Sequence, residues 1–419
     1  MKAGSASRRR LRGLEARVED DGVRLRCYMS TPFFQKQSGL KRRKPVKVRV
    51  FRRAAAGFVF GEDYAEYFDG AMPRAEDRIF EGVLPAINER KFEFVDPDVR
   101  PGQVLMYWVS TDRGDVPIGP AAVRVRDREV WWPFEKIVSR MEALAGAHPE
   151  TVAIRTFGRT VRRRPLRGVL AGRGRRTLAL VGALHAGESG PELMLPALER
   201  LVCEDAQLLR RVRVAALPVV NADERERLAT GVPWYIRRNA NGVDLNRNFD
   251  ADWGQLSTAY GLLTDDPDSE TYCGPAASSE PETRAVVAFV RKTAPRAIFS
   301  YHWLASIAGC GLLAPKSAAE DRAFDRVSGK LVGAYRRGFC GERGQRSHPN
   351  YWCTPGSFPE WAYRNGRIPC FDVEGSRKAP AEQAAATDGT TPEMIREYGQ
   401  RHYRAIRAVL EVLARAERK

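Results

Sequence analysis

The sequence predicts an α/β protein with a mixed, largely parallel sheet flanked by helices, preceded by an all-β sandwich. Period-two strand patterns fill residues 13–126, and short apolar runs alternate with helical stripes after residue 131. The sequence Trp131-Trp132-Pro133 separates the two patterns. A chain of 419 residues has room for two or three domains. We expect a basic tail over 1–12, a sandwich over 13–130 and an α/β domain over 131–419.

The first domain is predicted from strands in which every second residue is apolar. After the turn residues Asp20, Asp21 and Gly22, the apolar positions are Val23, Leu25, Cys27 and Met29. Similar alternation recurs through Val46–Val50, Phe92–Phe94, Val104–Trp108 and Val123–Val125. Several short strands with turns between them are typical of a β-sandwich. The segment 101–125 resembles the last two strands of a fibronectin type III-like domain.

The second domain is predicted from buried strands that alternate with helices. The apolar runs Thr177–Val181, Val212–Val220, Ala297–Ser300 and Pro369–Val373 indicate the strands. Helical stripes begin at Phe134, Pro191 and Glu282, and Thr391-Pro392 begins the last helix. The alternation favours a largely parallel sheet. Segment 375–390, rich in Ala, Thr and Gly, is expected to be a surface loop.

The composition excludes several classes of protein. Hydrophobic residues make up 43% of the chain, which excludes a disordered tail protein, and seven cysteines in 419 residues exclude a small disulfide scaffold. The charge of +17 comes from scattered arginines, with only short clusters such as 8–10 and 41–44, so it does not predict nucleic-acid binding. We expect no signal peptide, no membrane span and therefore a cytoplasmic protein.

Two histidines and a glutamate carry the strongest chemical signal. His185 and Glu188 follow the predicted strand Thr177–Val181, and His302 follows the strand Ala297–Ser300. In a parallel sheet the carboxyl ends of the strands meet at one edge, where ligands bind. Two His and one Glu are a common ligand set of catalytic zinc. Glu374 ends another apolar strand and could act as general base toward a water at the metal.

These residues resemble the zinc carboxypeptidase family, which includes the pancreatic carboxypeptidases A and B. The H-x-x-E motif of the family matches His185 and Glu188, and its distal zinc histidine matches His302. Its R-x-N…G-V-D-x-N-R-N segment matches residues 237–249. Its S-E-P-E-T stretch matches residues 279–283, and its catalytic glutamate matches Glu374. The ordered set covers about residues 131 to 415.

The resemblance implies one Zn²⁺ per chain and a role for each matching residue. Zinc would be held by His185, Glu188 and His302. Glu374 would take a proton from the attacking water and pass one to the leaving amine. Arg237 would stabilise the developing oxyanion. Asn246 and Arg247 would grip the terminal carboxylate of the substrate, for which a planar guanidinium is well suited.

The substrate is left open by the sequence. The family tyrosine falls on Trp352 by spacing, whereas a single insertion would restore Tyr351, which we name as the substrate-binding residue. Glu360 could favour a basic terminal residue or could be a structural acid. Thr354-Pro355-Gly356-Ser357-Phe358 looks like the bacterial branch that cleaves muropeptides, while the preceding sandwich is similar to the cytosolic branch.

The leading hypothesis is therefore a zinc metallocarboxypeptidase, a hydrolase acting on a peptide or muropeptide with a free C-terminal carboxylate. Two alternatives remain at this point. One is a catalytically silent module that uses zinc to bind a peptide end, and the other is a muropeptide amidase of the same fold.

Overall fold

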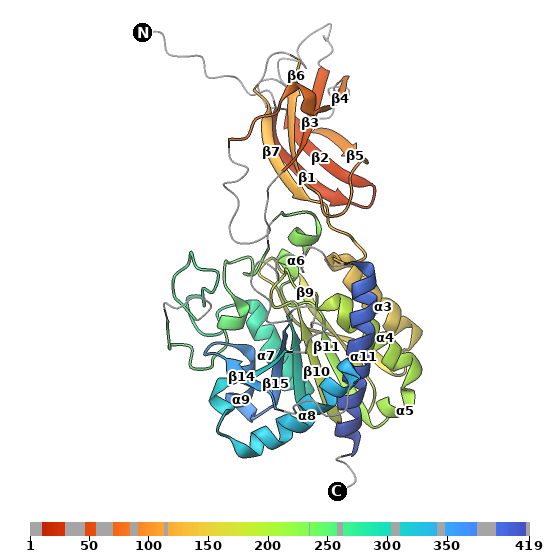
Figure 1. Cartoon of the computed structure of the whole chain (residues 1–419), viewed down its shortest axis with the longest axis vertical. Coiled ribbons are helices and arrows are strands. Elements are labelled where there is room, and N and C mark those ends of the chain that lie inside the picture. Colours follow the sequence, from red (N-terminus) through yellow and green to blue (C-terminus); the bar gives the residue numbers. More distant parts are fainter. Residues whose placement is uncertain are drawn as a thin grey trace. The chain divides into compact units, whose positions relative to one another are not determined.

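The computed structural model describes residues 11–29, 47–55, 70–83, 91–112, 116–233, 235–257, 263–302, 311–341, 348–374 and 391–415. The expected basic clusters at 8–10 and 41–44, Cys310 and the expected loop 375–390 lie outside these ranges. The chain forms two compact units (Figure 1). The first comprises Met1–Arg128 and Arg227–Tyr235, and the second comprises Glu129–Glu226 and Ile236–Lys419.

The first unit contains two antiparallel sheets. One has the order β1-β2-β5 and the other the order β4-β3-β6-β7. The strands are β1 (Leu11–Glu19), β2 (Gly22–Met29), β3 (Lys47–Ala54), β4 (Arg78–Val83), β5 (Lys91–Asp96), β6 (Val104–Thr111) and β7 (Ile118–Arg124). The alternating apolar residues of both sheets meet in a single buried core that includes Leu25, Cys27, Val48 and Val50. The predicted β-rich region is thus present.

The two units have other bounds than the domains expected over 1–12, 13–130 and 131–419. Strand β1 begins at Leu11, inside the expected tail 1–12. The segment Arg227–Tyr235 groups with the first unit, because Val18 N donates to Thr230 O at 2.8 Å and Arg124 N donates to Gly231 O at 2.7 Å. These are backbone hydrogen bonds between residues about 100 or more positions apart, so no local sequence pattern predicts them.

The second unit is built on an eight-stranded mixed sheet of order β14-β13-β15-β12-β10-β11-β9-β8. Four of its neighbouring pairs are parallel, including the central β11-β10-β12-β15 run, and three are antiparallel. The bounds are β8 (Val152–Arg159), β9 (Pro165–Ala171), β10 (Arg176–Gly182), β11 (Val212–Leu217), β12 (Ala297–Tyr301), β13 (Gly311–Pro315), β14 (Asn350–Cys353) and β15 (Cys370–Glu374). The predicted fold class is confirmed. Strand β11 ends earlier than expected, at Leu217, because Pro218 follows and has no N–H.

Helices cover both faces of this sheet (Figure 1). The helices in the described ranges are α3 (Phe134–Ala147), α4 (Pro191–Glu204), α5 (Ala206–Leu209), α6 (Ala222–Ala229), α7 (Pro281–Thr293), α8 (Arg322–Cys340), α9 (Phe358–Gly366) and α11 (Pro392–Arg415). Helix α11 packs against α4 and α8, and Met394 N donates to the Thr391 hydroxyl that caps it. The central strands β10 and β12 are buried along almost their whole length, as expected between two helical layers. None of the helices in the described ranges is long and apolar enough to cross a membrane.

Candidate active site

The candidate metal ligands lie where the sheet order brings two strand ends together. Strands β10 and β12 are parallel neighbours, with Val181 paired to Ser300 and Gly182 paired to Tyr301. His185 and His302 follow the ends of these strands, so both imidazoles lie at the carboxyl edge of the sheet. The chain turns tightly after β10, since a Cβ on Gly190 would lie only 2.8 Å from the Gly182 Cα. This close approach returns Glu188 to the same edge.

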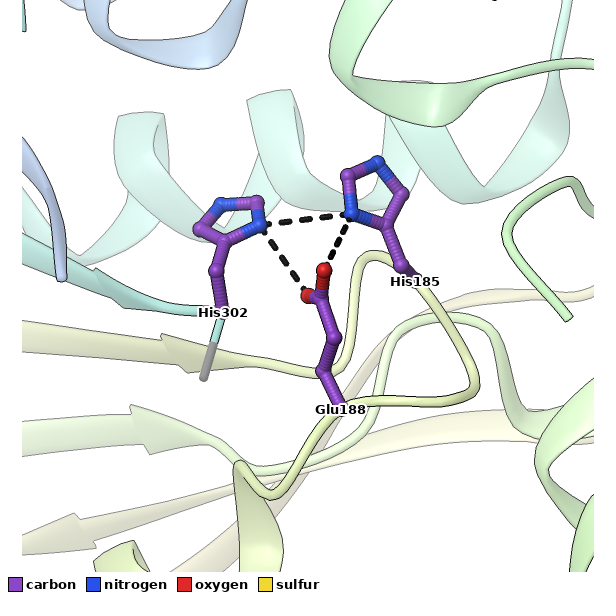
Figure 2. A group of neighbouring side chains, drawn as sticks. All are labelled: His185, Glu188 and His302. Carbon is purple, nitrogen blue, oxygen red and sulfur yellow. Dashed lines mark hydrogen bonds and ion pairs between the residues drawn. The ribbon is translucent and has the colours of Figure 1, made fainter. Parts of the chain in front are cut away.

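The three side chains converge on one another (Figure 2). His185 Nδ1 lies 2.7 Å from Glu188 Oε1, His302 Nδ1 lies 3.0 Å from Glu188 Oε2, and the two Nδ1 atoms are 3.4 Å apart. All three residues are buried. Burial alone would raise the pKa of Glu188, but the two imidazoles lower it to about 2, so the carboxylate is ionised at neutral pH.

Two further buried carboxylates face the opposite nitrogens of the imidazoles. Asp244 Oδ1 lies 2.9 Å from His185 Nε2, and Asp372 Oδ1 lies 3.2 Å from His302 Nε2. The Nε2 atom of His302 also makes a 3.1 Å hydrogen bond with the Ser300 hydroxyl. A proton held on Nε2 leaves Nδ1 unprotonated, which is the form that binds a metal.

This donor set fits zinc. Two imidazole Nδ1 atoms and one ionised carboxylate, each offering a ligand atom within 4.8 Å of the others, match the protein ligands of a catalytic zinc site. Behind His185 the Asp244 carboxylate supplies the hydrogen-bond acceptor that such ligands commonly have, and behind His302 the Asp372 carboxylate lies at ion-pair distance. The residues that the sequence named as metal ligands are therefore brought together.

Glu374 lies on the same edge, at the end of β15. Strand β15 is the parallel neighbour of β12, and Val373 pairs with Tyr301. Burial raises the pKa of Glu374 to about 7; the two imidazoles oppose that rise, and the carboxylates Glu188 and Asp372 add to it. A carboxylate with a pKa near the working pH is suited to accept and return a proton.

Arg237 is held in place by Asp244. Its Nε and Nη2 lie 2.9 and 2.8 Å from Asp244 Oδ2, while the other oxygen of Asp244 serves His185. Burial would raise the pKa of Asp244, but Arg237 and His185 lower it below its usual range. Asp244 therefore stays ionised and links one imidazole to the arginine.

Asn246 and Arg247 lie in the short 3-10 turn η2 (Leu245–Arg247), which Asp244 caps by accepting from Asn246 N at 2.9 Å. The Asn246 amide donates to Asp372 Oδ2 at 3.0 Å and accepts from Phe358 N at 2.8 Å. Together with His185, Glu188, Arg237 and Glu374, both residues line one cavity of about 300 Å³.

Tyr351 does not line this cavity. It lies in β14, and its hydroxyl donates to Asp325 at 2.8 Å. Trp352 lines the cavity instead and is 66% exposed. The two side chains diverge because successive residues of a strand face opposite sides of the sheet. The structure therefore places Trp352, and not Tyr351, at the cavity, while the assignment of Tyr351 to substrate binding stays a prediction.

Glu360 does not line the cavity either. It is buried at the start of α9, where its carboxylate accepts from the backbone N and the hydroxyl of Ser317. Of the two roles considered for this residue, the structural one agrees with the contacts.

A sequence profile of the family described as zinc carboxypeptidase matches residues 137–394, which is more than half of the chain. The chain belongs to the zinc carboxypeptidase family. The resemblance drawn from the motifs is thereby confirmed, and the family consists of zinc-dependent hydrolases.

Known members of the zinc carboxypeptidase family align with parts of the chain. The chain is 32% identical to mast cell carboxypeptidase A of Rattus norvegicus over 38% of its length and 41% of the relative. It is 27% identical to carboxypeptidase A6 of Mus musculus over 59% of its length and 60% of the relative. The chain thus matches less than two thirds of the length of either relative.

Solved structures share the fold at low sequence identity. Carboxypeptidase A from Helicoverpa armigera superposes with a TM-score of 0.55 at 17% identity, over 70% of this chain and 76% of that one. Bovine thrombin-activatable fibrinolysis inhibitor, in complex with tick carboxypeptidase inhibitor, superposes with a TM-score of 0.53 at 19% identity, over 69% and 99% of the two chains. These likenesses concern the fold alone.

Sequence reasoning missed the carboxylates Asp244 and Asp372 and the buried cation Arg225. Arg225 donates to the carbonyls of Ala186 and Glu188, at 3.0 and 2.9 Å, and so fixes the ligand loop. Asp244 could have been found from chemistry, because a metal-binding histidine commonly donates its second N–H to a carboxylate. The other two residues depend on tertiary contacts with no local signal.

Proposed function

We propose that the chain is a zinc-dependent metallocarboxypeptidase that hydrolyses the C-terminal amide bond of a peptide. One observation carries the proposal: His185, Glu188 and His302 converge at one sheet edge, and two of these ligands line the same cavity as Glu374 and two arginines. Ligands, base and cationic groups are the parts that metal-assisted amide hydrolysis needs.

Each residue has a separate task in the proposed reaction. Arg247 and Asn246 bind the terminal carboxylate of the substrate and so select the last peptide bond. Glu374, ionised above a pKa of about 7, accepts a proton from the attacking water and returns one to the leaving amine. Arg237, aligned by Asp244, stabilises the negative charge that develops on the scissile carbonyl oxygen. Bound zinc would polarise that carbonyl and lower the pKa of the attacking water.

The cavity volume of about 300 Å³ supports a substrate that inserts a single terminal residue. A peptide and a muropeptide both present a terminal carboxylate, and we propose this shared group as the recognised feature. A silent binding module is less well supported, because a binding role does not need Glu374 with its raised pKa.

Mass spectrometry of a mixture of peptides and muropeptides tests the proposal. The full chain is incubated with each mixture, with and without a zinc chelator, and the products are identified. We expect loss of one C-terminal residue, abolished by the chelator and restored by added zinc. The same peptides with amidated C-termini should not be cleaved, because they lack the carboxylate. Undiminished cleavage by the chelated protein, or no cleavage of any substrate, would reject the proposal.

A further inference from the structure

Asp372 contacts both the metal site and the site expected to bind substrate. One of its oxygens, Oδ1, lies 3.2 Å from Nε2 of His302, and the other accepts a 3.0 Å hydrogen bond from the amide of Asn246. Its exposed fraction is only 3%, so water does not compete for these contacts. Asp372 lies two residues before Glu374 in β15.

We infer that Asp372 is a positioning residue that couples zinc binding by His302 to carboxylate binding by Asn246. The inference deepens the proposed function, since it takes the roles of His302 and Asn246 from it. It adds a residue that is not one of the expected metal ligands and that would act on both sites through its two oxygens.

The two contacts of Asp372 call for an acceptor on both sides: Oδ2 accepts a hydrogen bond from Asn246, and Oδ1 lies at ion-pair distance from His302 Nε2. Asn246 Oδ1 accepts from Phe358 N at 2.8 Å, which orients the amide so that its N–H faces Asp372. On the other side, an imidazole that binds metal through Nδ1 carries its proton on Nε2. A carboxylate has two acceptor oxygens, whereas an amide has one acceptor and one donor. An Asn at this position would therefore turn its NH₂ group toward either the Asn246 amide or the N–H of His302, so that two donors would face each other there.

Two other residues offer matched controls that separate this coupling from a general effect on packing. Ser300 contacts His302 Nε2 at 3.1 Å, and no hydrogen bond between its side chain and Asn246 is found in the described ranges. Glu360 is a buried acid of the same unit whose carboxylate is used by Ser317. The Ser300→Ala change thus tests the histidine alone, and Glu360→Gln tests the general effect of replacing a buried acid with its amide.

The test measures metal and carboxylate binding separately, without turnover. Zinc affinity is measured by competition with a chelating dye. Carboxylate binding to the metal-free protein is measured by calorimetry with a series of N-acetyl amino acids, and the corresponding amides serve as ligand controls. We expect Asp372→Asn to lower the affinity for zinc by about 10–100-fold. The affinity for the N-acetyl amino acids should fall by about 10-fold, which is equivalent to one hydrogen bond of about 1.4 kcal/mol. Ser300→Ala should lower the affinity for zinc only, and Glu360→Gln should change neither the zinc affinity nor the carboxylate affinity.

Asn246→Ala provides a second route if Asp372→Asn fails to fold. Although Asn246 is not a metal ligand, its loss frees one oxygen of Asp372 and should lower zinc affinity several-fold. The inference is overturned if Asp372→Asn folds and keeps wild-type zinc affinity, if only one of the two affinities changes, or if Asn246→Ala leaves zinc binding unchanged. These readouts are independent of hydrolysis, so an inactive wild-type protein would reject the proposed function without affecting them.

Discussion

His185 Nε2 lies 2.9 Å from Oδ1 of Asp244, and both side chains are buried. Because the carboxylate accepts a hydrogen bond from the N–H at Nε2, Nδ1 of the imidazole is left unprotonated, faces Glu188 and can bind a metal. The same carboxylate aligns Arg237 through its second oxygen. Asp244 therefore connects the first metal ligand to the group expected to stabilise the oxyanion.

Replacing Asp244 with Asn should weaken zinc binding by about 10–100-fold, because an amide no longer enforces the metal-binding tautomer of His185. It should also reduce kcat in the zinc-saturated protein, because Arg237 loses its charged partner. Dye competition and steady-state kinetics at saturating zinc measure the two effects. As a control, Asp252→Asn removes an acid that is paired with Arg364 on the surface, and both quantities should stay at wild-type values. Unchanged zinc affinity in Asp244→Asn would contradict this role.

Glu374→Gln separates catalysis from binding. The amide keeps the size of the side chain but cannot accept the proton of the attacking water, so kcat should fall by at least about 100-fold. The KM and the affinity for zinc should change by less than about threefold, because Glu374 is not among the three expected ligands. Glu397→Gln on α11 is the exposed control. If Glu374→Gln retains more than a tenth of the wild-type kcat, another group acts as the base.

The sequence was sufficient for the fold class and for the grouping of His185, Glu188 and His302. Period-two and helical patterns are local, and parallel strands necessarily bring the residues after them to one edge. Two apolar runs and the two histidines after them therefore carried the prediction.

Other features depend on contacts that a linear pattern does not encode. Tyr351 and Trp352 are adjacent in sequence, and only the side of the sheet that each faces decides which one reaches the cavity. Arg227–Tyr235 joins the first unit through backbone bonds to distant strands. In the sequence Asp372 looks like an ordinary strand residue. Only the register of β12 and β15 places it opposite Ser300 and near His302.

Trp352 should matter for substrate binding and Tyr351 should not. Trp352→Ala removes an exposed aromatic surface from the cavity and should raise KM by about 3–10-fold for peptides with an apolar residue before the cleaved bond, or about 1 kcal/mol. Tyr351→Phe loses the hydrogen bond to Asp325 and should lower the free energy of unfolding by about 1–2 kcal/mol while leaving kcat/KM within twofold. A tenfold loss of kcat in Tyr351→Phe would show that the two side chains exchange roles when substrate binds.

Arg225 is expected to be essential for stability. It is fully buried, forms an ion pair with Glu192 and donates to two carbonyls of the metal-ligand loop. Arg225→Met would leave the Glu192 carboxylate buried without its cation, which should cost about 3–5 kcal/mol in the free energy of unfolding. Denaturant titration measures the change, and Arg396→Met, on an exposed pair, should cost less than about 1 kcal/mol. Adding Glu192→Gln to Arg225→Met should recover part of the loss, since the amide carries no charge.

His402 should make the protein less stable in acid. Its imidazole is fully buried on α11, with Nδ1 2.6 Å from the Tyr335 hydroxyl, and burial lowers its pKa from 6.5 to about 3. Between pH 6.5 and 3 the unfolded chain therefore binds a proton at this position and the folded chain does not. The free energy of unfolding should fall as pH falls through this window, by up to about 1.4 kcal/mol per pH unit from this group.

His402→Asn isolates this contribution, because Asn retains a polar atom near the position of Nδ1 but does not titrate. The variant should be less stable than wild type at pH 7, where it loses packing of the ring, yet should lose less additional stability between pH 7 and pH 4. Denaturant titrations at several pH values give both quantities. His348→Asn, which removes an exposed imidazole and keeps His402, should retain the steep wild-type dependence. Equal pH dependence in wild type and His402→Asn would show that His402 is not the group that titrates.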